Sequence, residues 1–146
     1  MKAAVLTEFG QPLSIQTLDD PRIGTGEVIV DIAAAGVTSY AGRVFSGSRN
    51  YMLEVPVVPG AGGIGRVRAT GPDATRLKIG EWVYCEPTVR SRDDAQNPDT
   101  ILQGWTYRSE AALPLHRLYH HGSFAEQMLL PTENVTPIGD IDAADA

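Results

Sequence analysis

Short stretches in which hydrophobic and polar residues alternate dominate this chain, and turn-forming residues close each of them. In one such stretch, Val28, Val30 and Ile32 fall on one face of an extended chain, while Glu27 and Asp31 fall on the other. A period of two is typical of a half-buried strand in an antiparallel sheet. We therefore predict a mainly β fold, with strands at residues 2–7, 13–18, 27–33, 63–70, 81–86 and 123–130.

Helical patterns are rare in this sequence. Residues 38–45 begin with a Thr and a Ser, which are good N-terminal caps, and Gly47 follows as a stop. This pattern predicts one short helix. Near the end of the chain, Asp140 or Asp142 precedes alanines, and this pattern predicts the first turn of a second helix.

A polar stretch between Pro87 and Gly122 is too long to be an ordinary loop. It contains no cysteine, so its own hydrophobic side chains must order it. The candidates for this packing are Ile101, Leu102, Trp105, Tyr107, Leu113, Leu115 and Leu118. We expect these residues to form a long lobe, part of which could lack order.

Three histidines of this lobe, His116, His120 and His121, form the one cluster in the sequence with the character of metal ligands. The first two are one helical turn apart, but a third type of ligand and a paired motif are missing. We expect partly exposed histidines without a metal. The alternative is zinc held by His116 and His120 with Cys85, which metal analysis of the purified protein would test.

The 146 residues carry 18 acidic and 12 basic side chains, giving a net charge of −6. Nucleic acid is not an expected partner, because its phosphates demand clustered Lys and Arg. No hydrophobic run approaches the roughly 20 residues of a membrane helix, and the first one ends at Thr7, too early for a signal peptide. We expect a cytoplasmic protein with no membrane partner. The single cysteine, Cys85, lies in an alternating stretch and is expected to be a structural thiol.

Two segments carry a family resemblance. Residues 36–47 read G-V-T-S-Y-A-G-R-V-F-S-G, and residues 57–67 read V-V-P-G-A-G-G-I-G-R-V. Together with G-S-F-A-E at 122–126, they resemble the front half of a medium-chain dehydrogenase/reductase, the superfamily of the zinc alcohol dehydrogenases. The resemblance implies that residues 1–146 form a GroES-like substrate-side domain, a partly closed β-barrel with one or two short helices and a long lobe. It also implies a Rossmann cofactor domain beyond the last residue.

The zinc enzymes of this superfamily bind their catalytic metal through a Cys of the first segment and a His of the second, with a Glu close by. Thr38, Ala61 and Gly62 occupy those three places here. Since a catalytic zinc needs thiolate or imidazole ligands, no zinc is expected. The resemblance therefore implies the zinc-independent branch, which is similar to the quinone oxidoreductases and enone reductases.

Tyr40 occupies the place of the Ser or Thr that relays a proton in the zinc enzymes. A phenol donates well to a developing oxyanion, so the resemblance implies catalytic roles for Tyr40 and Thr38. It also implies cofactor contacts for Ser39 and Val37. The alternative interpretation is structural: Thr38 and Ser39 cap the helix, and Tyr40 packs in the core.

Residues 60–65 fit the G-x-G-x-x-G pattern of a phosphate-binding loop. Such a loop follows a buried strand and opens a helix. Two prolines precede this segment, however, and a strand pattern follows it. We therefore expect close backbone packing at a turn of the barrel rather than phosphate binding.

The resemblance implies a function. The chain is expected to be the substrate-binding domain of an NAD(P)H-dependent oxidoreductase that reduces quinones or α,β-unsaturated carbonyl compounds. NADPH or NADH would be bound mainly by the missing domain, and the full-length protein could form a homodimer. The alternative is a stand-alone GroES-like binding module, similar to a co-chaperonin and without catalysis.

Overall fold

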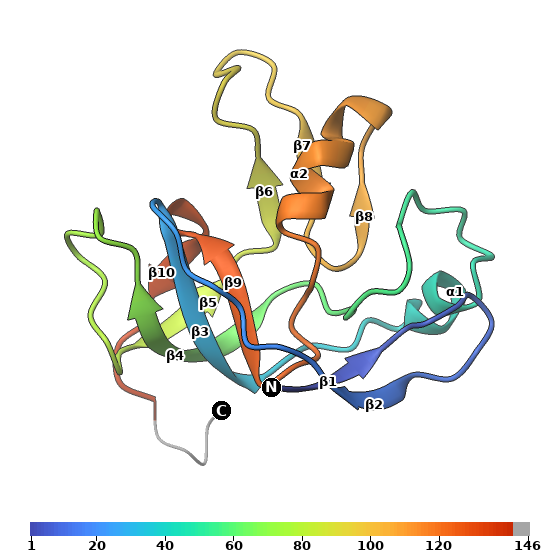
Figure 1. The fold of residues 1–146 in the computed structure, drawn as a ribbon, viewed down its shortest axis with the longest axis horizontal. Coiled ribbons are helices and arrows are strands. Elements are labelled where there is room, and N and C mark those ends of the chain that lie inside the picture. Colours follow the sequence, from blue (N-terminus) through green and yellow to red (C-terminus); the bar gives the residue numbers. More distant parts are fainter. Residues whose placement is uncertain (142–146) are drawn as a thin grey trace.

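The computed structural model describes residues 1–141, and its largest element is a five-stranded antiparallel sheet (Figure 1). The strand order is β10-β5-β4-β3-β9. Their bounds are β3 (Glu27–Ala34), β4 (Gly63–Thr70), β5 (Trp82–Cys85), β9 (Gln127–Pro131) and β10 (Val135–Pro137). Within the described part of the chain, the edge strands β9 and β10 do not pair with each other, so the barrel is only partly closed. The mainly β fold predicted from the sequence is confirmed.

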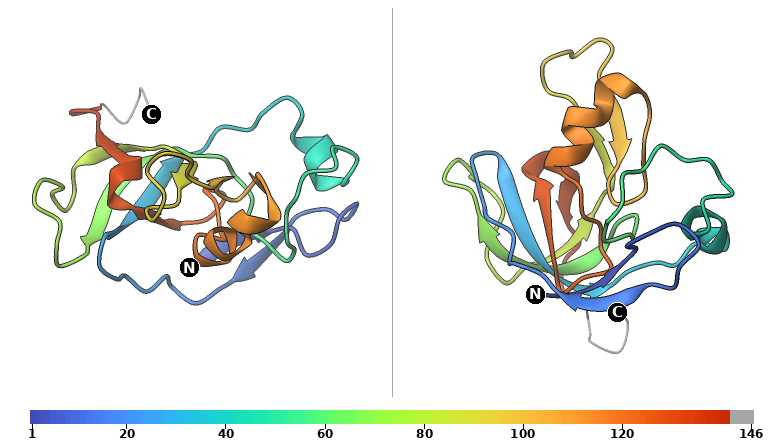
Figure 2. Two further views of the ribbon diagram at one scale, coloured as in Figure 1. Left: turned by 90° about the horizontal axis from the view of Figure 1, so that it is seen from above. Right: turned by 45° about the vertical axis from the view of Figure 1, so that its right-hand side comes forward.

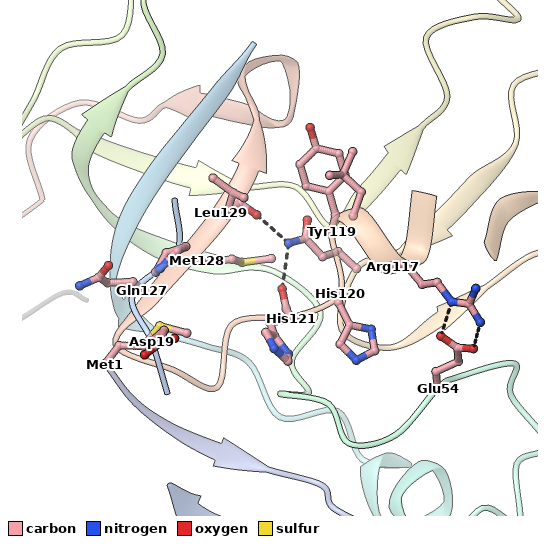
Figure 3. Close-up of a pocket in the computed structure, with 13 residues that line it drawn as sticks. Met1, Asp19, Glu54, Arg117, Tyr119, His120, His121, Gln127, Met128 and Leu129 are labelled. Atoms are coloured by element: carbon pink, nitrogen blue, oxygen red, sulfur yellow. Dashed lines mark hydrogen bonds and ion pairs between the residues drawn. The ribbon is translucent and has the colours of Figure 1, made fainter. Parts of the chain in front are cut away.

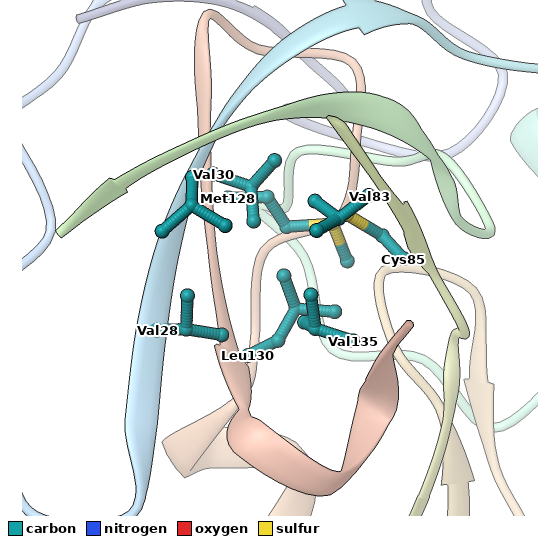
Figure 4. Packing of buried hydrophobic residues seen from close by; sticks show 8 residues of the cluster. Val28, Val30, Val83, Cys85, Met128, Leu130 and Val135 are labelled. Carbon is teal, nitrogen blue, oxygen red and sulfur yellow. The ribbon is translucent and has the colours of Figure 1, made fainter. Parts of the chain in front are cut away.

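One hydrophobic core covers a single face of this sheet (Figure 4). Its buried members are Val28, Val30, Val67, Val83, Cys85, Met128, Leu130 and Val135. Val28 and Val30 are fully buried, as the alternation in the sequence predicts. Ile29, which the alternation places on the opposite face, is also buried, with 6% of its surface exposed. The second face of this strand is therefore covered at Ile29, while Ala33 on the same face is exposed.

A two-stranded ribbon lies beside the sheet and consists of β1 (Lys2–Val5) and β2 (Ser14–Thr17). Isolated bridges join Ala3 to Ala125 and Leu6 to Val57, so the ribbon is tied to two distant parts of the chain. The strand expected at 123–130 begins only at Gln127. Of the residues before Gln127, Ala125 forms only the isolated bridge to Ala3, which is too little for a strand.

The stretch from Pro87 to Gly122 is an ordered lobe with its own sheet, and it projects from the barrel in Figure 1 and in the right-hand view of Figure 2. It contains β6 (Thr88–Arg90), β7 (Thr100–Leu102), β8 (Thr106–Tyr107), the 3₁₀ helix η1 (Glu110–Ala112) and α2 (Leu113–Leu118). Its core consists of Val89, Ile101, Ala112 and Tyr119, with Tyr107 and Leu115 packed against them.

Four of the residues expected to order the lobe lie outside its core, and the half-buried Leu113 is one of them. Leu102 and Trp105 pack in a different cluster, together with Leu6, Ala41 and Val57. Leu118 is 60% exposed. The strands β6, β7 and β8 have only two or three residues each. A strand this short contains too few positions for a hydrophobic period, so the sequence could not predict the three-stranded sheet.

The helix expected at 38–45 is shorter than predicted: α1 spans Ala41–Phe45. Neither Thr38 nor Ser39 caps it, because its N-cap is Tyr40 and no side-chain hydrogen bond caps this end. The backbone amide of Ala41 donates instead to the carbonyl oxygen of Thr38, at 3.0 Å. Gly47 ends the helical segment with a φ of 77°, as predicted.

The last element is η2 (Thr132–Asn134), which leads into β10. Asp140, one predicted start of a C-terminal helix, is not helical, and Asp142 and the alanines after it lie outside the described residues. Among residues 1–141, the helices are all too short for any of them to cross a lipid bilayer.

Candidate functional site

The end of β3 and the start of β4 frame a shallow hollow of about 430 Å³. Antiparallel pairing places these two ends together, because Ala34 lies opposite Ile64. The residues that line the hollow are Ala34, Ala35, Gly36, Ala61, Gly62, Gly63, Ile64 and Tyr84. The two segments that carry the family resemblance therefore meet at one place in the fold.

Backbone packing excludes side chains from much of this hollow. Gly62 has a φ of +78°, and a Cβ atom there would lie 2.6 Å from the carbonyl oxygen of Cys85. A Cβ atom on Gly65 would collide with the carbonyl oxygen of Asp31. The strand β4 begins at Gly63, and no helix follows the glycines. This arrangement confirms close backbone packing at the G-x-G-x-x-G segment, since a phosphate loop would need a helix there.

The predicted site residues lie just after β3, before α1. The side chain of Val37 is 72% exposed, and Ser39 is exposed as well. The hydroxyl oxygen of Thr38 is buried and has no hydrogen-bond partner within residues 1–141. A buried hydroxyl without a partner is uncommon and needs an explanation.

Tyr40 belongs partly to the core, as the structural interpretation expects. Its ring meets the ring of Trp105 edge-on, with centroids 6.2 Å apart and planes at 71°. Tyr40 and Ala61 both pack against the cluster around Trp105. The structure thus brings Tyr40 and Ala61 to one cluster, while Val37 and Ser39 face outward.

Tyr84 is a candidate that the sequence analysis missed. It lies on β5, is 41% exposed and lines the hollow opposite the glycines. The alternation of residues 81–86 predicts that Tyr84 points away from Cys85. Tyr84 lies at the hollow because it pairs with Ile64 in the sheet. This register is set by how the two strands pair, so the sequence of β5 alone could not reveal it.

A second pocket, of about 390 Å³, lies between the end of α2 and β9, and Figure 3 shows it. Its lining includes His120, His121, Gln103 and Met128. Gln103 is buried, and its Nε2 donates to the carbonyl oxygens of His121 and Leu129, at 2.8 and 2.7 Å. These bonds fix the amide between the lobe and the sheet.

The three histidines form hydrogen bonds with the backbone of residues 54–58. The Nε2 atom of His116 accepts from the amide of Glu54 at 3.3 Å, and the Nδ1 atom of His121 accepts from the amide of Val58 at 3.1 Å. Between them, Nε2 of His120 donates to the carbonyl oxygen of Pro56 at 2.8 Å.

The expectation of partly exposed histidines holds for His120 and His121, which are half-buried, and is wrong for His116, which is fully buried. Burial lowers the pKa of His116 and of His121 to about 4, because the charged imidazolium would lose its hydration. The zinc alternative is also wrong for this structure. Within residues 1–141, no three His, Cys, Asp or Glu side chains lie close enough together to hold a metal. Cys85 lies in the sheet core, where burial raises its pKa to about 12.

Comparison with known proteins places the chain in a family. Residues 24–140 match the alcohol dehydrogenase GroES-like domain. An alcohol dehydrogenase of Geobacillus stearothermophilus is 36% identical over 89 residues, which cover 58% of this chain and 26% of that enzyme. The L-threonine 3-dehydrogenase of Streptomyces coelicolor is 29% identical over 150 residues, covering 99% of this chain and 42% of that enzyme.

A solved structure of an NAD-dependent alcohol dehydrogenase superposes with a TM-score of 0.76 at 27% identity, over 94% of this chain and 39% of that one. The chain thus spans between about a quarter and two fifths of the length of these relatives. By the residues matched and by its fold, this chain belongs to the alcohol dehydrogenase GroES-like domain family of the medium-chain dehydrogenase/reductase superfamily.

Proposed function

We propose that this chain is the substrate-side domain of a zinc-independent, NAD(P)H-dependent oxidoreductase. In this proposal a Rossmann domain follows residue 146 and holds most of the cofactor. Support comes from the family match over residues 24–140 and from relatives that are named dehydrogenases and are more than twice as long. A cytoplasmic location and a homodimeric full-length enzyme belong to the same proposal. No observation favours the alternative of a stand-alone binding module.

The residues at the zinc positions do not fit the metal, and this observation carries the proposal. Thr38 offers a hydroxyl in place of a thiolate, and Ala61 offers a methyl group that packs in the cluster around Trp105. Gly62 has no room for a carboxylate side chain, because even a Cβ atom would lie 2.6 Å from a carbonyl oxygen. Zinc requires soft or borderline ligands, so this donor set cannot hold it.

Without a Lewis acid, hydrogen-bond donors must meet the negative charge that develops on the carbonyl oxygen. When bound, the nicotinamide supplies the hydride. In this proposal the Thr38 hydroxyl, which is buried and has no partner within the described residues, is one donor to that oxygen. The phenol of Tyr40 is the second donor, on a ring that Trp105 holds in place. Val37 and Ser39 are exposed before α1, where they can contact the cofactor.

The substrate class follows from the weakness of two neutral donors. A simple ketone concentrates the new charge on one oxygen atom. A quinone or an α,β-unsaturated carbonyl compound accepts hydride at carbon and spreads the charge over an enolate. We therefore propose that such conjugated acceptors are the substrates, and that the final proton comes from Tyr40 or from solvent.

The test uses the full-length parent chain. Quinones and enones are screened with NADH and with NADPH, and the metal content of the active protein is measured. Reduction of a conjugated acceptor by metal-free protein supports the proposal, and activity that requires zinc contradicts it. Tyr40→Phe and Thr38→Val separate the two donors. Each variant should lower kcat about 10-fold to 100-fold, which is at or below the loss of about 100-fold to 1,000-fold that is typical for one oxyanion-hole donor. An unchanged kcat removes that residue from the mechanism.

A further inference from the structure

Arg49, in the loop after α1, lies with its guanidinium over two tyrosine rings. Its Cζ atom is 4.3 Å from the centre of the Tyr40 ring and 5.1 Å from the centre of the Tyr51 ring. The Tyr40 ring is held edge-on against Trp105, which is 1% exposed. Stacking of this kind fixes the flat face of the guanidinium against the rings. The N–H groups lie in the plane of the guanidinium and point outward from its edge, so they stay available for hydrogen bonds.

Those N–H groups are unused within residues 1–141. The guanidinium of Arg49 donates no hydrogen bond and forms no ion pair there. Arg66 is also stacked, 4.3 Å from the ring centre of Trp82, but it donates to the carbonyl oxygen of Gly80 at 2.6 Å. Arg68, Arg92 and Arg117 each pair with a carboxylate. Arg49 is therefore an exposed arginine that stacking holds in place and whose guanidinium has no partner in the described chain.

The segment that carries Arg49 is positively charged, although the chain as a whole carries a charge of −6. Residues 32–53 contain Arg43 and Arg49 and no Asp or Glu. On a neighbouring element, Glu8 lies in the connection between β1 and β2, which meets α1 through a bond from the Gly10 amide to the Phe45 carbonyl oxygen, at 2.8 Å. Glu8 is exposed and forms no ion pair with Arg49.

We propose that Arg49 binds a carboxylate of the substrate, so that the acceptor is an anionic carbonyl compound. This inference rests on the proposed function, because it takes Tyr40 as a donor to the reacting carbonyl. A guanidinium matches a carboxylate in shape and can donate two parallel hydrogen bonds to it. Since Arg49 lies on the Tyr40 ring, one molecule can place its carboxylate at Arg49 and its carbonyl oxygen at the Tyr40 phenol.

The kinetic test compares an unsaturated keto acid with its methyl ester, using the full-length parent chain. The two acceptors differ in charge and share the reacting group. Arg49→Gln should raise KM for the acid about tenfold or more, since charged hydrogen bonds of this kind contribute about one to two powers of ten in affinity. KM for the ester should not change. Arg43→Gln is the matched control, because Arg43 is exposed on the same segment, stacks on no ring among the described residues, and should leave both KM values unchanged.

Two kinetic outcomes overturn the inference. One is a wild-type enzyme that uses acid and ester equally well. The other is an Arg49→Gln enzyme in which both KM values rise together, as expected if Arg49 only supports the packing of Tyr40 and Tyr51.

A binding measurement separates this inference from the proposed function. Calorimetry follows binding of the saturated analogue of the keto acid, which has no double bond to reduce, to wild type and to Arg49→Gln. Binding to wild type that is lost in Arg49→Gln supports the carboxylate site, whether or not any acceptor is reduced. A failure to reduce every acceptor would contradict the proposed function and leave the carboxylate site standing. No binding of the saturated acid to wild type at millimolar concentration overturns the carboxylate site.

Discussion

The Nδ1 atom of His121 accepts a hydrogen bond from the backbone amide of Val58, 63 residues away in sequence, at 3.1 Å. His116 makes the matching bond to the amide of Glu54. Both imidazoles accept through a nitrogen that protonation would convert into a donor. The lobe is therefore held to the loop before β4 by histidines that must be neutral.

This relationship predicts a loss of stability in weak acid. The pKa of His116 and His121 is lowered from 6.5 to about 4 in the folded chain, so between these values the unfolded chain binds more protons. The stabilisation is complete above pH 6.5 and is lost as the pH falls toward 4. We expect the free energy of unfolding to fall by about 2 kcal/mol per histidine between pH 8 and pH 5. Urea unfolding at several pH values measures it.

The control for this prediction is His121→Asn, whose amide oxygen can accept a bond without titrating. This variant should show a smaller drop between pH 8 and pH 5 than wild type. A free energy of unfolding that stays constant over that interval would contradict the assignment of neutral, buried imidazoles.

Gly62 tests the packing that excludes a carboxylate from the zinc position. Gly62→Ala combines a positive φ with a contact of 2.6 Å to a backbone oxygen, so it should destabilise the fold by about 3 kcal/mol. Gly80→Ala is the matched control, because Gly80 has a φ of +87° and no atom within 4 Å of its Cβ position. The control should cost only about 1 kcal/mol. Equal losses for the two variants would show that the backbone at Gly62 can move aside.

Gln103 joins the lobe to the sheet through two hydrogen bonds from one amide. Gln103→Met keeps the volume and leaves the carbonyl oxygens of His121 and Leu129 without their donor. We expect a loss of about 2–4 kcal/mol in the free energy of unfolding, from two unpaired buried acceptors. Gln11→Met, at an exposed position, should have an effect within about 0.5 kcal/mol. If both variants unfold at the same urea concentration as wild type, the bonds of Gln103 do not stabilise the fold.

Cys85 should resist thiol reagents in the native chain. It is fully buried, and its pKa is raised to about 12, so almost no thiolate is present at pH 8. We expect labelling by a disulfide reagent to proceed only at the rate of unfolding. In guanidinium chloride the same thiol should react within seconds. Rapid labelling of the folded protein would mean that the sheet core around Cys85 opens locally.

The sequence by itself determined the fold class and the family. Alternation with a period of two marked four of the five strands of the largest sheet, β3, β4, β5 and β9, because one face of a half-buried strand is hydrophobic and the other is polar. It missed β10, which has three residues and therefore too few positions to show a period. The order of the glycine-rich segments gave the family, and the resemblance implied that Thr38 and Ala61 stand where the zinc enzymes carry a Cys and a His. These are properties of local pattern and of residue type.

Only the tertiary structure decided how distant residues meet. The helix α1 starts at Ala41 because Tyr40 packs against Trp105 and the Thr38 hydroxyl stays unpaired, which no cap pattern could reveal. The three histidines bond to residues 54–58, and Tyr84 reaches the hollow through its register with Ile64. Each of these contacts joins segments separated by 20 residues or more, so its energy depends on the packed fold and leaves no period in the sequence.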